Sequence, residues 1–253
     1  MKNILLTMLM FGLFGLPCSA QTFAGHSYET SFPATENPIA EAQGGQPVWQ
    51  NGAQAPQMDW TNMRSTGGKA FGTQPRNGNY DDSTALLTGT WGPNQTASMT
   101  VAQTGSANEL EVEIRLRSSW NTHSATGYEC DVAPGYTVIV RWNGPLGSYK
   151  PLTALGPGAG NGDVITCSVS GTNPTTIVMK KNGSTILTAS DNGSSGNGFG
   201  AFGPWTSGNP GIGWFTSARG DANASDYAIS HFIVSDGATA TLQPPTSLHV
   251  TVQ

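Results

Sequence analysis

The chain has 253 residues, a formal net charge of −5 at pH 7 and only 11% charged residues. With this acidic balance it lacks the basic surface that nucleic acid or an anionic membrane would require, so both are excluded as partners. Gly and small polar residues replace the missing charges, while seven Trp, nine Phe and six Tyr supply material for a core, so we expect a folded, turn-rich extracellular β protein.

Residues 1–20 have the pattern of an export signal. Lys2 precedes an apolar run over residues 4–16, and small residues precede the expected cleavage site. The run is shorter than the roughly 20 residues that a membrane helix needs. We therefore predict a cleaved signal peptide, a mature chain that begins at Gln21, no membrane span, and a secreted location (extracellular, periplasmic or cell surface). Lipid attachment to Cys18 is the alternative, which the preceding proline disfavours.

Strand signals dominate from residue 80 onward. Residues 21–79 are richer in Pro, Gly and Gln, which predicts an extended chain with few strands. We expect Trp49 and Trp60 to pack this segment onto the β domain. Asn182-Gly183 is a two-residue hairpin signal. Without amphipathic helices, strands arriving in sequence indicate a sandwich or a barrel. The predicted strands are Ala97 to Gln103, Glu109 to Arg117, Thr126 to Val132, Tyr136 to Trp142, Asp163 to Ser170, Thr175 to Lys181, Thr185 to Ala189 and Tyr227 to Ser235.

The domain boundary is expected at Asp236-Gly237, which closes the last strand. Residues 21–236 would then form one domain, since all-β sandwiches of roughly 200–250 residues are common. Residues 237–253 are interpreted as a linker or as the opening strand of a fibronectin type III-like module. A tail strand or a disordered end is the alternative.

Five segments in this order resemble the concanavalin A-like lectin/glucanase superfamily, which has a laminin G-like jelly roll: Ser124-Ala-Thr-Gly-Tyr-Glu129, Val138-Ile-Val-Arg-Trp142, Asn182-Gly183, Asn209-Pro-Gly-Ile-Gly213 and Tyr227 to Ser235. The resemblance covers roughly residues 80 to 236. It implies an all-β, two-sheet antiparallel jelly-roll sandwich with ligand bound across a concave face. It does not decide between binding and catalysis, because the superfamily includes lectins, adhesion modules, glycoside hydrolases and polysaccharide lyases.

The strand from Glu109 to Arg117 alternates strictly between apolar and charged residues. Period-two geometry directs its four apolar side chains into the core and its charged side chains to the opposite face. Phasing the next two strands in the same way adds Glu129, Asp131 and Arg141 to that face. We expect one polar patch formed by Glu113, Arg115, Glu129 and Arg141. A solvated outer face with cross-strand ion pairs is the alternative.

The patch favours binding over catalysis. A retaining glycosidase needs two carboxyls about 5–5.5 Å apart, and Glu113 and Glu129 are the candidates if the protein is an enzyme. However, the strand lacks the Glu-x-Asp-x-x-Glu spacing of laminarinase-type relatives, and no Gln-x-His of alginate lyases occurs. We therefore expect a noncatalytic carbohydrate-binding or adhesion-type module. A glycan-active enzyme and a purely structural surface domain are the alternatives.

The expected partner is a polysaccharide or glycan, bound by arginine forks, carboxylates and aromatic rings on which a sugar stacks. Trp120 beside His123 is the preferred platform, although each tryptophan also suits core packing. The sequence gives no indication of oligomeric state. The candidate binding residues are Arg115, Arg117, Trp120, His123, Glu129, Arg141 and Trp142.

No cofactor motif is present, and the four histidines lack the spacing of a zinc site. Asp81, Asp82 and Asp226 carry oxygen ligands of the kind that a structural calcium takes. Their role as turn formers is the alternative reading.

Cys130 and Cys167 remain after signal cleavage. In a simple meander their strands flank the Tyr136 to Trp142 strand, which places them roughly 9–10 Å apart, beyond the ~7 Å Cα limit for a disulfide. We therefore predict two buried free thiols, with a disulfide as the alternative.

Overall fold

The computed structural model describes residues 25–54, 60–74, 82–105, 110–145, 147–193, 202–216 and 224–237. The predicted signal peptide and the predicted C-terminal strand beyond residue 237 lie outside these ranges. No helix among the described residues is long and apolar enough to cross a membrane.

Nearly all of the regular secondary structure in the described chain is β-strand, as predicted. Two single-turn 3₁₀ helices, η1 (Gly52–Gln54) and η2 (Ala224–Asp226), accompany the strands. The strands are β1 (Ser27–Thr30), β2 (Trp49–Asn51), β3 (Thr61–Ser65), β4 (Ala70–Gly72), β5 (Ser83–Leu87), β6 (Gln95–Gln103), β7 (Leu110–Asn121), β8 (Ser124–Val132), β9 (Thr137–Pro145), β10 (Tyr149–Pro151), β11 (Val164–Ser170), β12 (Thr175–Lys181), β13 (Ser184–Asp191), β14 (Asn209–Thr216) and β15 (Tyr227–Ser235).

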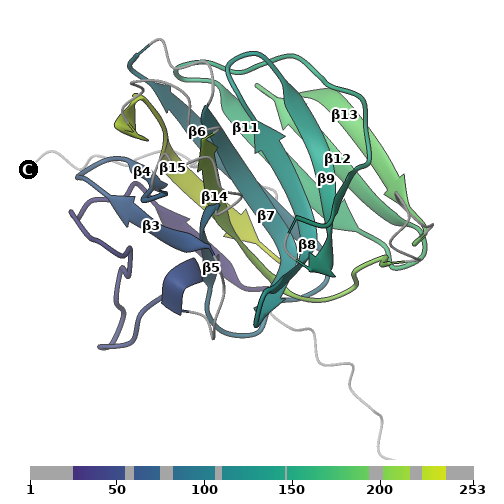
Figure 1. The fold of residues 1–253 in the computed structure, drawn as a ribbon, viewed down its shortest axis with the longest axis horizontal. Coiled ribbons are helices and arrows are strands. Elements are labelled where there is room, and N and C mark those ends of the chain that lie inside the picture. The colour runs from purple at the N-terminus through teal and green to yellow at the C-terminus, as the bar shows by residue number, and fades with distance from the viewer. Residues whose placement is uncertain are drawn as a thin grey trace, which may run out of the picture.

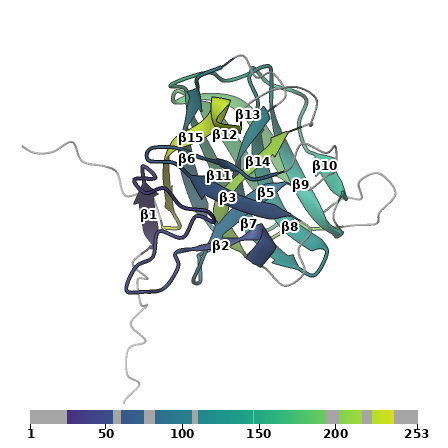
Figure 2. The same cartoon turned by 60° about the vertical axis from the view of Figure 1, so that its left-hand side comes forward.

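The strands form two layers that stack face to face (Figures 1 and 2). The β7 layer has the order β10-β9-β8-β7-β14-β5, with β2 beside β5, and the β6 layer has the order β4-β15-β6-β11-β12-β13, with β1 beside β15. Strand β3 pairs with both β5 and β4 and so joins the two layers along one side. The all-β jelly-roll sandwich is confirmed.

The core lies between the layers, and β7 shows why. Leu110, Val112, Ile114 and Leu116 are completely buried, as their period-two spacing predicted. The N-terminal segment packs onto the sandwich through Trp49 and Trp60, as expected, and both are almost fully buried. The hairpin at Asn182-Gly183 is also confirmed, because it connects β12 to β13 with positive φ at both residues.

The prediction of free thiols is wrong, because Cys130 and Cys167 form a disulfide with their Cα atoms 6.5 Å apart. The simple meander assumed for them does not exist. Cys130 is in β8, between β7 and β9, and Cys167 is in β11, between β6 and β12. The two strands belong to opposite layers, so the disulfide crosses the core instead of spanning an intervening strand.

Candidate functional site

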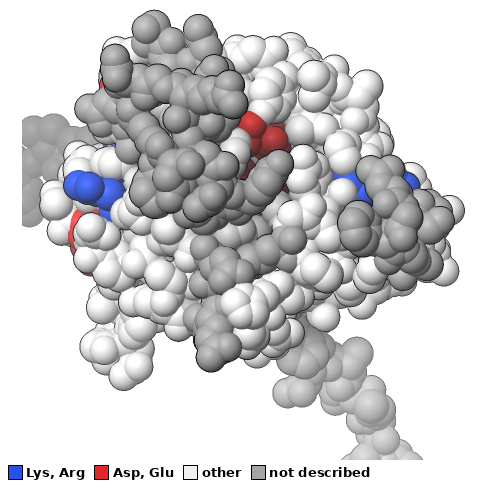
Figure 3. Space-filling view, viewed as in Figure 1, with Lys and Arg blue, Asp and Glu red and all other residues white. Residues whose placement is uncertain are grey.

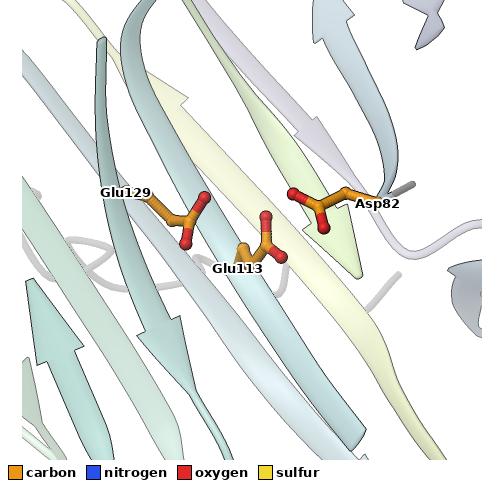
Figure 4. A group of neighbouring side chains, drawn as sticks. All are labelled: Asp82, Glu113 and Glu129. Carbon is orange, nitrogen blue, oxygen red and sulfur yellow. The ribbon is translucent and has the colours of Figure 1, made fainter. Parts of the chain in front are cut away.

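Carboxyl side chains gather on the outer face of the β7 layer, which points away from the β6 layer. Glu111 and Glu113 extend from β7, and Glu129 and Asp131 extend from β8. Glu113 lies directly opposite Asp131 in the antiparallel register, next to the Arg115 and Glu129 pair. Asp82, just before β5, reaches the same place from across β14, and Figure 4 shows its carboxylate directed toward those of Glu113 and Glu129.

The guanidinium of Arg115 lies among these carboxylates. Its Nη2 is 3.0 Å from Asp82 Oδ2 and 2.9 Å from Glu129 Oε2, and it also forms an ion pair with Glu113. The guanidinium carbon is 4.5 Å from the ring centre of Trp60 and 5.7 Å from that of Trp142. Arg115 is only 2% exposed, so the protein uses it as an internal cation in a largely desolvated cluster.

Among the described residues, one group of carboxylates lies close enough to share a cation. Asp82, Glu113 and Glu129 each place an oxygen within 4.8 Å of the others. Arg115 Nη2 already contacts all three, so it supplies the positive charge that a calcium ion would bring. Asp226 is not part of this group, and Asp81 lies outside the described residues. The structural calcium stays a prediction, and this arrangement does not favour it.

A glycine in β14 makes room for the ion pair. Gly213 lies directly opposite Glu113 in the register between β14 and β7. A Cβ at this position would lie 2.0 Å from Glu113 Oε2 and 2.8 Å from Arg115 Nε. The Glu113 and Arg115 side chains therefore lie flat over β14 in a space that only glycine leaves free.

The carboxylates line a pocket of about 470 Å³. Acidic side chains appear in a hollow near the middle of the face seen in Figure 3, while Lys and Arg appear only toward its margins. One wall is aromatic and apolar, and within it Tyr149 is 44% exposed. The lining residues are Asp82, Glu111, Glu113, Glu129, Asp131, Tyr136, Val138, Val140, Trp142, Tyr149, Pro151, Thr153, Ala154, Leu155 and Phe215.

Burial among like charges raises the pKa values of the carboxyls. Desolvation, with the carboxylates of Glu129 and Asp82 nearby, raises the pKa of Glu111 to about 8. Desolvation also raises the pKa of Glu113 and Asp131 well above the ordinary range, although Arg115 opposes the shift at both. Tyr136 donates a hydrogen bond to Glu111, and Trp142 Nε1 donates to Glu129 over 2.7 Å. Glu111 therefore holds a proton at neutral pH.

The structure brings four of the predicted residues together at the pocket: Glu113, Arg115, Glu129 and Trp142. Two others lie elsewhere. Trp120 packs partly buried against the cluster that contains Trp60 and Val140, and His123 is exposed at the β7–β8 turn with a φ of 51°. Neither of them lines the pocket.

The expectation that Arg141 belongs to the polar patch is wrong. Arg141 pairs with Tyr128 across β8 and β9, whereas Glu129 pairs with Val140. Arg141 therefore points between the layers, where it is fully buried and forms an ion pair with Asp191. The assumed phase was reversed, because Val138 and Val140 face the pocket and Ile139 faces the core.

Arg117 also leaves the patch, although period two would place it beside Arg115. The register of β7 shifts between Leu116 and Ser119, and Arg117 has a φ of 47°. This β-bulge turns the side chain away from the pocket face. Its guanidinium donates to the carbonyl oxygens of Pro93, Gly171 and Trp205 and is fully buried.

Sequence reasoning missed several lining residues as site residues. Glu111 and Asp131 follow from the period-two pattern that placed Glu113 and Glu129, so the signal was present. Tyr149 had no such signal, because β10 contains only three residues. Trp60, which covers Arg115, comes from a distant segment whose sequence shows no clear strand.

No family model matches the chain, and no curated protein matches it. Solved structures similar in fold include β-agarase A in complex with oligoagarose, at 10% identity and a TM-score of 0.50, covering 84% of this chain and 94% of that one. The carbohydrate-binding module CBM66 from Bacillus subtilis is 11% identical with a TM-score of 0.46, over 75% of this chain and 92% of that one. The GH43 protein BlXynB from Bacillus licheniformis is 14% identical with a TM-score of 0.45, over 83% of this chain and 39% of that one. The likeness to β-agarase A shows a jelly-roll fold, which is the fold that the motif order implied.

Proposed function

We propose that this protein is a secreted, noncatalytic carbohydrate-binding or adhesion-type module that holds a glycan in the pocket of the β7 layer. The observation that carries the proposal is the composition of this pocket, which combines carboxyl groups with aromatic side chains, among them Tyr136, Trp142 and Tyr149. Sugars combine a ring face that stacks on aromatic side chains with hydroxyls that donate to carboxylates. The solved structures of similar fold include a carbohydrate-binding module and an agarase.

The burial and ion pairing of Glu113 and Glu129 favour glycan binding over glycan hydrolysis. Both carboxylates form ion pairs with Arg115, and they are 1% and 5% exposed. A catalytic nucleophile must reach the anomeric carbon, and a catalytic acid must deliver a proton to the leaving oxygen. Carboxylates bound to a buried guanidinium are poorly placed for either role.

Export is supported by the disulfide between Cys130 and Cys167, because disulfides persist in oxidising compartments and are rare in the cytosol. Mass spectrometry of protein recovered outside the cytoplasm should give a mature N-terminus at Gln21. An intact Met1 or an acylated Cys18 would contradict this part of the proposal.

The binding proposal is tested with a glycan array followed by calorimetry on the best ligand. Tyr149→Ala removes an exposed ring from the pocket wall and should weaken binding at least about tenfold while the melting temperature changes little, since base and sugar stacking energies are of order 1–3 kcal/mol. Val164→Ala is the control, because Val164 is a 39% exposed apolar residue in β11 of the other layer. Equal affinities for the two variants would place the ligand outside this pocket.

A glycan-active enzyme is the second candidate, and the raised pKa of Glu111 is the observation that favours it. A carboxyl that stays protonated near neutral pH is suited to general acid catalysis. Release of reducing ends from a panel of polysaccharides measures this activity. If it occurs, Glu111→Gln or Asp131→Asn should abolish turnover and preserve binding. If no polysaccharide is cleaved, the proposal of a noncatalytic binding module stands.

A further inference from the structure

The charged side chains among the described lining residues of the pocket are all acidic. Among the residues that the structure describes, five carboxyl side chains line the pocket, and no lysine or arginine lines it. The nearby guanidinium of Arg115 is buried, and its Nη2 is already shared among three carboxylates. Glu111 and Asp131 make no ion pair with it. The described lining therefore holds more carboxyl groups than the buried guanidinium neutralises, and Glu111 compensates by holding a proton up to about pH 8, which a cationic ligand would replace.

Asp131 adds an observation independent of this charge excess. Its side chain is only 7% exposed, and its Oδ1 has no hydrogen-bond partner. A buried acceptor without a donor is rare in folded proteins, because leaving it unsatisfied is costly. Because Asp131 lines the pocket, the missing donor can come from a ligand.

A protonated amine meets both requirements. An ammonium group carries three donors and a positive charge, and charge-assisted hydrogen bonds to carboxylates are the stronger kind. A uronate or a sulfated sugar would bring negative charge to the same oxygens and be repelled.

The rest of the pocket favours a sugar as the carrier of this amine. Tyr136, Trp142 and Tyr149 form an aromatic side of the pocket, with the Trp142 and Tyr149 ring centres 5.4 Å apart. At about 470 Å³, the pocket lies in the range of small-ligand sites. A flexible aliphatic amine would leave these rings without a flat partner.

We propose that the pocket binds a glycan that contains positively charged amino sugars, with the ammonium group at Asp131 and Glu111 and the sugar ring against Tyr149 and Trp142. This inference rests on the proposed carbohydrate-binding function and names the class of glycan. Neutral sugars would use the same aromatic wall without supplying the missing donor, so they are expected to bind more weakly.

The test compares ligands that differ only in the amine. Calorimetry at about pH 7, which lies below the ordinary pKa of an amine and near the pKa of about 8 that Glu111 has in the folded protein, is carried out with a β-1,4-linked glucosamine tetramer, its fully N-acetylated counterpart, a tetrauronate and tetralysine. The glucosamine tetramer should bind at least about tenfold more tightly than the acetylated tetramer, with no binding of the tetrauronate. Asp131→Asn, which keeps the shape and removes the charge, should bring the two tetramers to similar affinity. Glu29→Gln, an exposed carboxylate in β1 beside His231, is the control and should leave the preference unchanged.

Other outcomes separate this inference from the proposed function. Equal binding of free and acetylated tetramers by the native protein overturns the amino-sugar preference and leaves the carbohydrate proposal standing. Binding of tetralysine as tightly as the glucosamine tetramer overturns the sugar as the recognised carrier. If no glycan on the array binds at all, the proposed function itself fails. Because these comparisons use the native protein, they decide the question even if Asp131→Asn does not fold.

Discussion

Arg115 forms an ion pair with Glu129 across the β7–β8 pair, with Nη2 and Oε2 2.9 Å apart. Arg115→Met removes the cation that Asp82, Glu113 and Glu129 share. Breaking a buried ion pair in this way costs about 3–5 kcal/mol, and we expect that loss in urea unfolding at pH 7. At pH 5 the loss should be smaller, because the carboxyls can take up protons. Arg64→Met is the control, since Arg64 lies over the Phe71 ring; equal losses for both variants would refute the central role of Arg115.

The stability of the native protein should fall as the pH rises through the neutral range. The pKa of Glu111 is raised from 4.5 to about 8 in the folded protein. Between these two pKa values the folded state holds a proton that the unfolded state has released. The stability that this carboxyl contributes is therefore fully present below about pH 4.5 and is lost as the pH rises through about 8. The decline is at most about 1.4 kcal/mol per pH unit for one carboxyl. Thermal melts from pH 5 to pH 8 measure it, and Glu111→Gln should flatten the curve; an unchanged curve would show that Glu111 is not responsible.

The disulfide should contribute substantially to stability. Cys130 and Cys167 are 37 residues apart in the sequence, and the loss of chain entropy for a loop of this size corresponds to about 4 kcal/mol. Thiol titration of the denatured, unreduced protein should find no free thiol. Cys130→Ser with Cys167→Ser should lower the free energy of unfolding by about 2–4 kcal/mol. Two titratable thiols in the secreted protein would contradict the pairing.

Gly213→Ala should displace the side chains of Glu113 and Arg115 beside the pocket. The new Cβ would overlap Glu113 Oε2 and crowd Arg115 Nε, which forces the ion pair to shift. We expect a loss of about 1–3 kcal/mol, typical of overpacking, together with weaker glycan binding. Gly135→Ala is the control, because no atom lies within 4 Å of a Cβ there. Similar unfolding curves for both variants would show that the space over β14 is not required.

Arg141→Met should reduce stability without affecting binding. Its guanidinium forms an ion pair with Asp191 between the layers, and Asp191 also accepts from Tyr128 over 2.8 Å. Removal of the cation leaves a buried carboxylate unpaired, at a cost of about 3–5 kcal/mol. Glycan affinity, measured at a temperature where the variant is folded, should match that of the native protein. A folded variant with lost affinity would return Arg141 to the binding site.

The sequence alone determined the fold class and the inward face of β7. Strict alternation from Leu110 to Leu116 has one physical reading, because successive side chains of a strand point to opposite faces and only the apolar set can face the core. The same alternation on β8 placed Glu129 and Asp131 on the other face. The Asn182-Gly183 turn was predictable because few residues tolerate positive φ at two successive positions.

The tertiary structure decided the side-chain directions and long-range contacts that the alternation of apolar and polar residues does not specify. In the run from Val138 to Trp142, apolar residues occupy both alternating sets of positions, so the sequence does not show which set faces the core. Arg141 was therefore assigned to the wrong face. A bulge after Leu116 redirected Arg117, and no local residue pattern marks that extra residue. The pairing of Cys130 with Cys167 depends on which strands face each other across the core, since strand order alone separates them. Trp60 covers Arg115 from a segment remote in the chain, because long-range packing brings together residues that no short-range pattern relates.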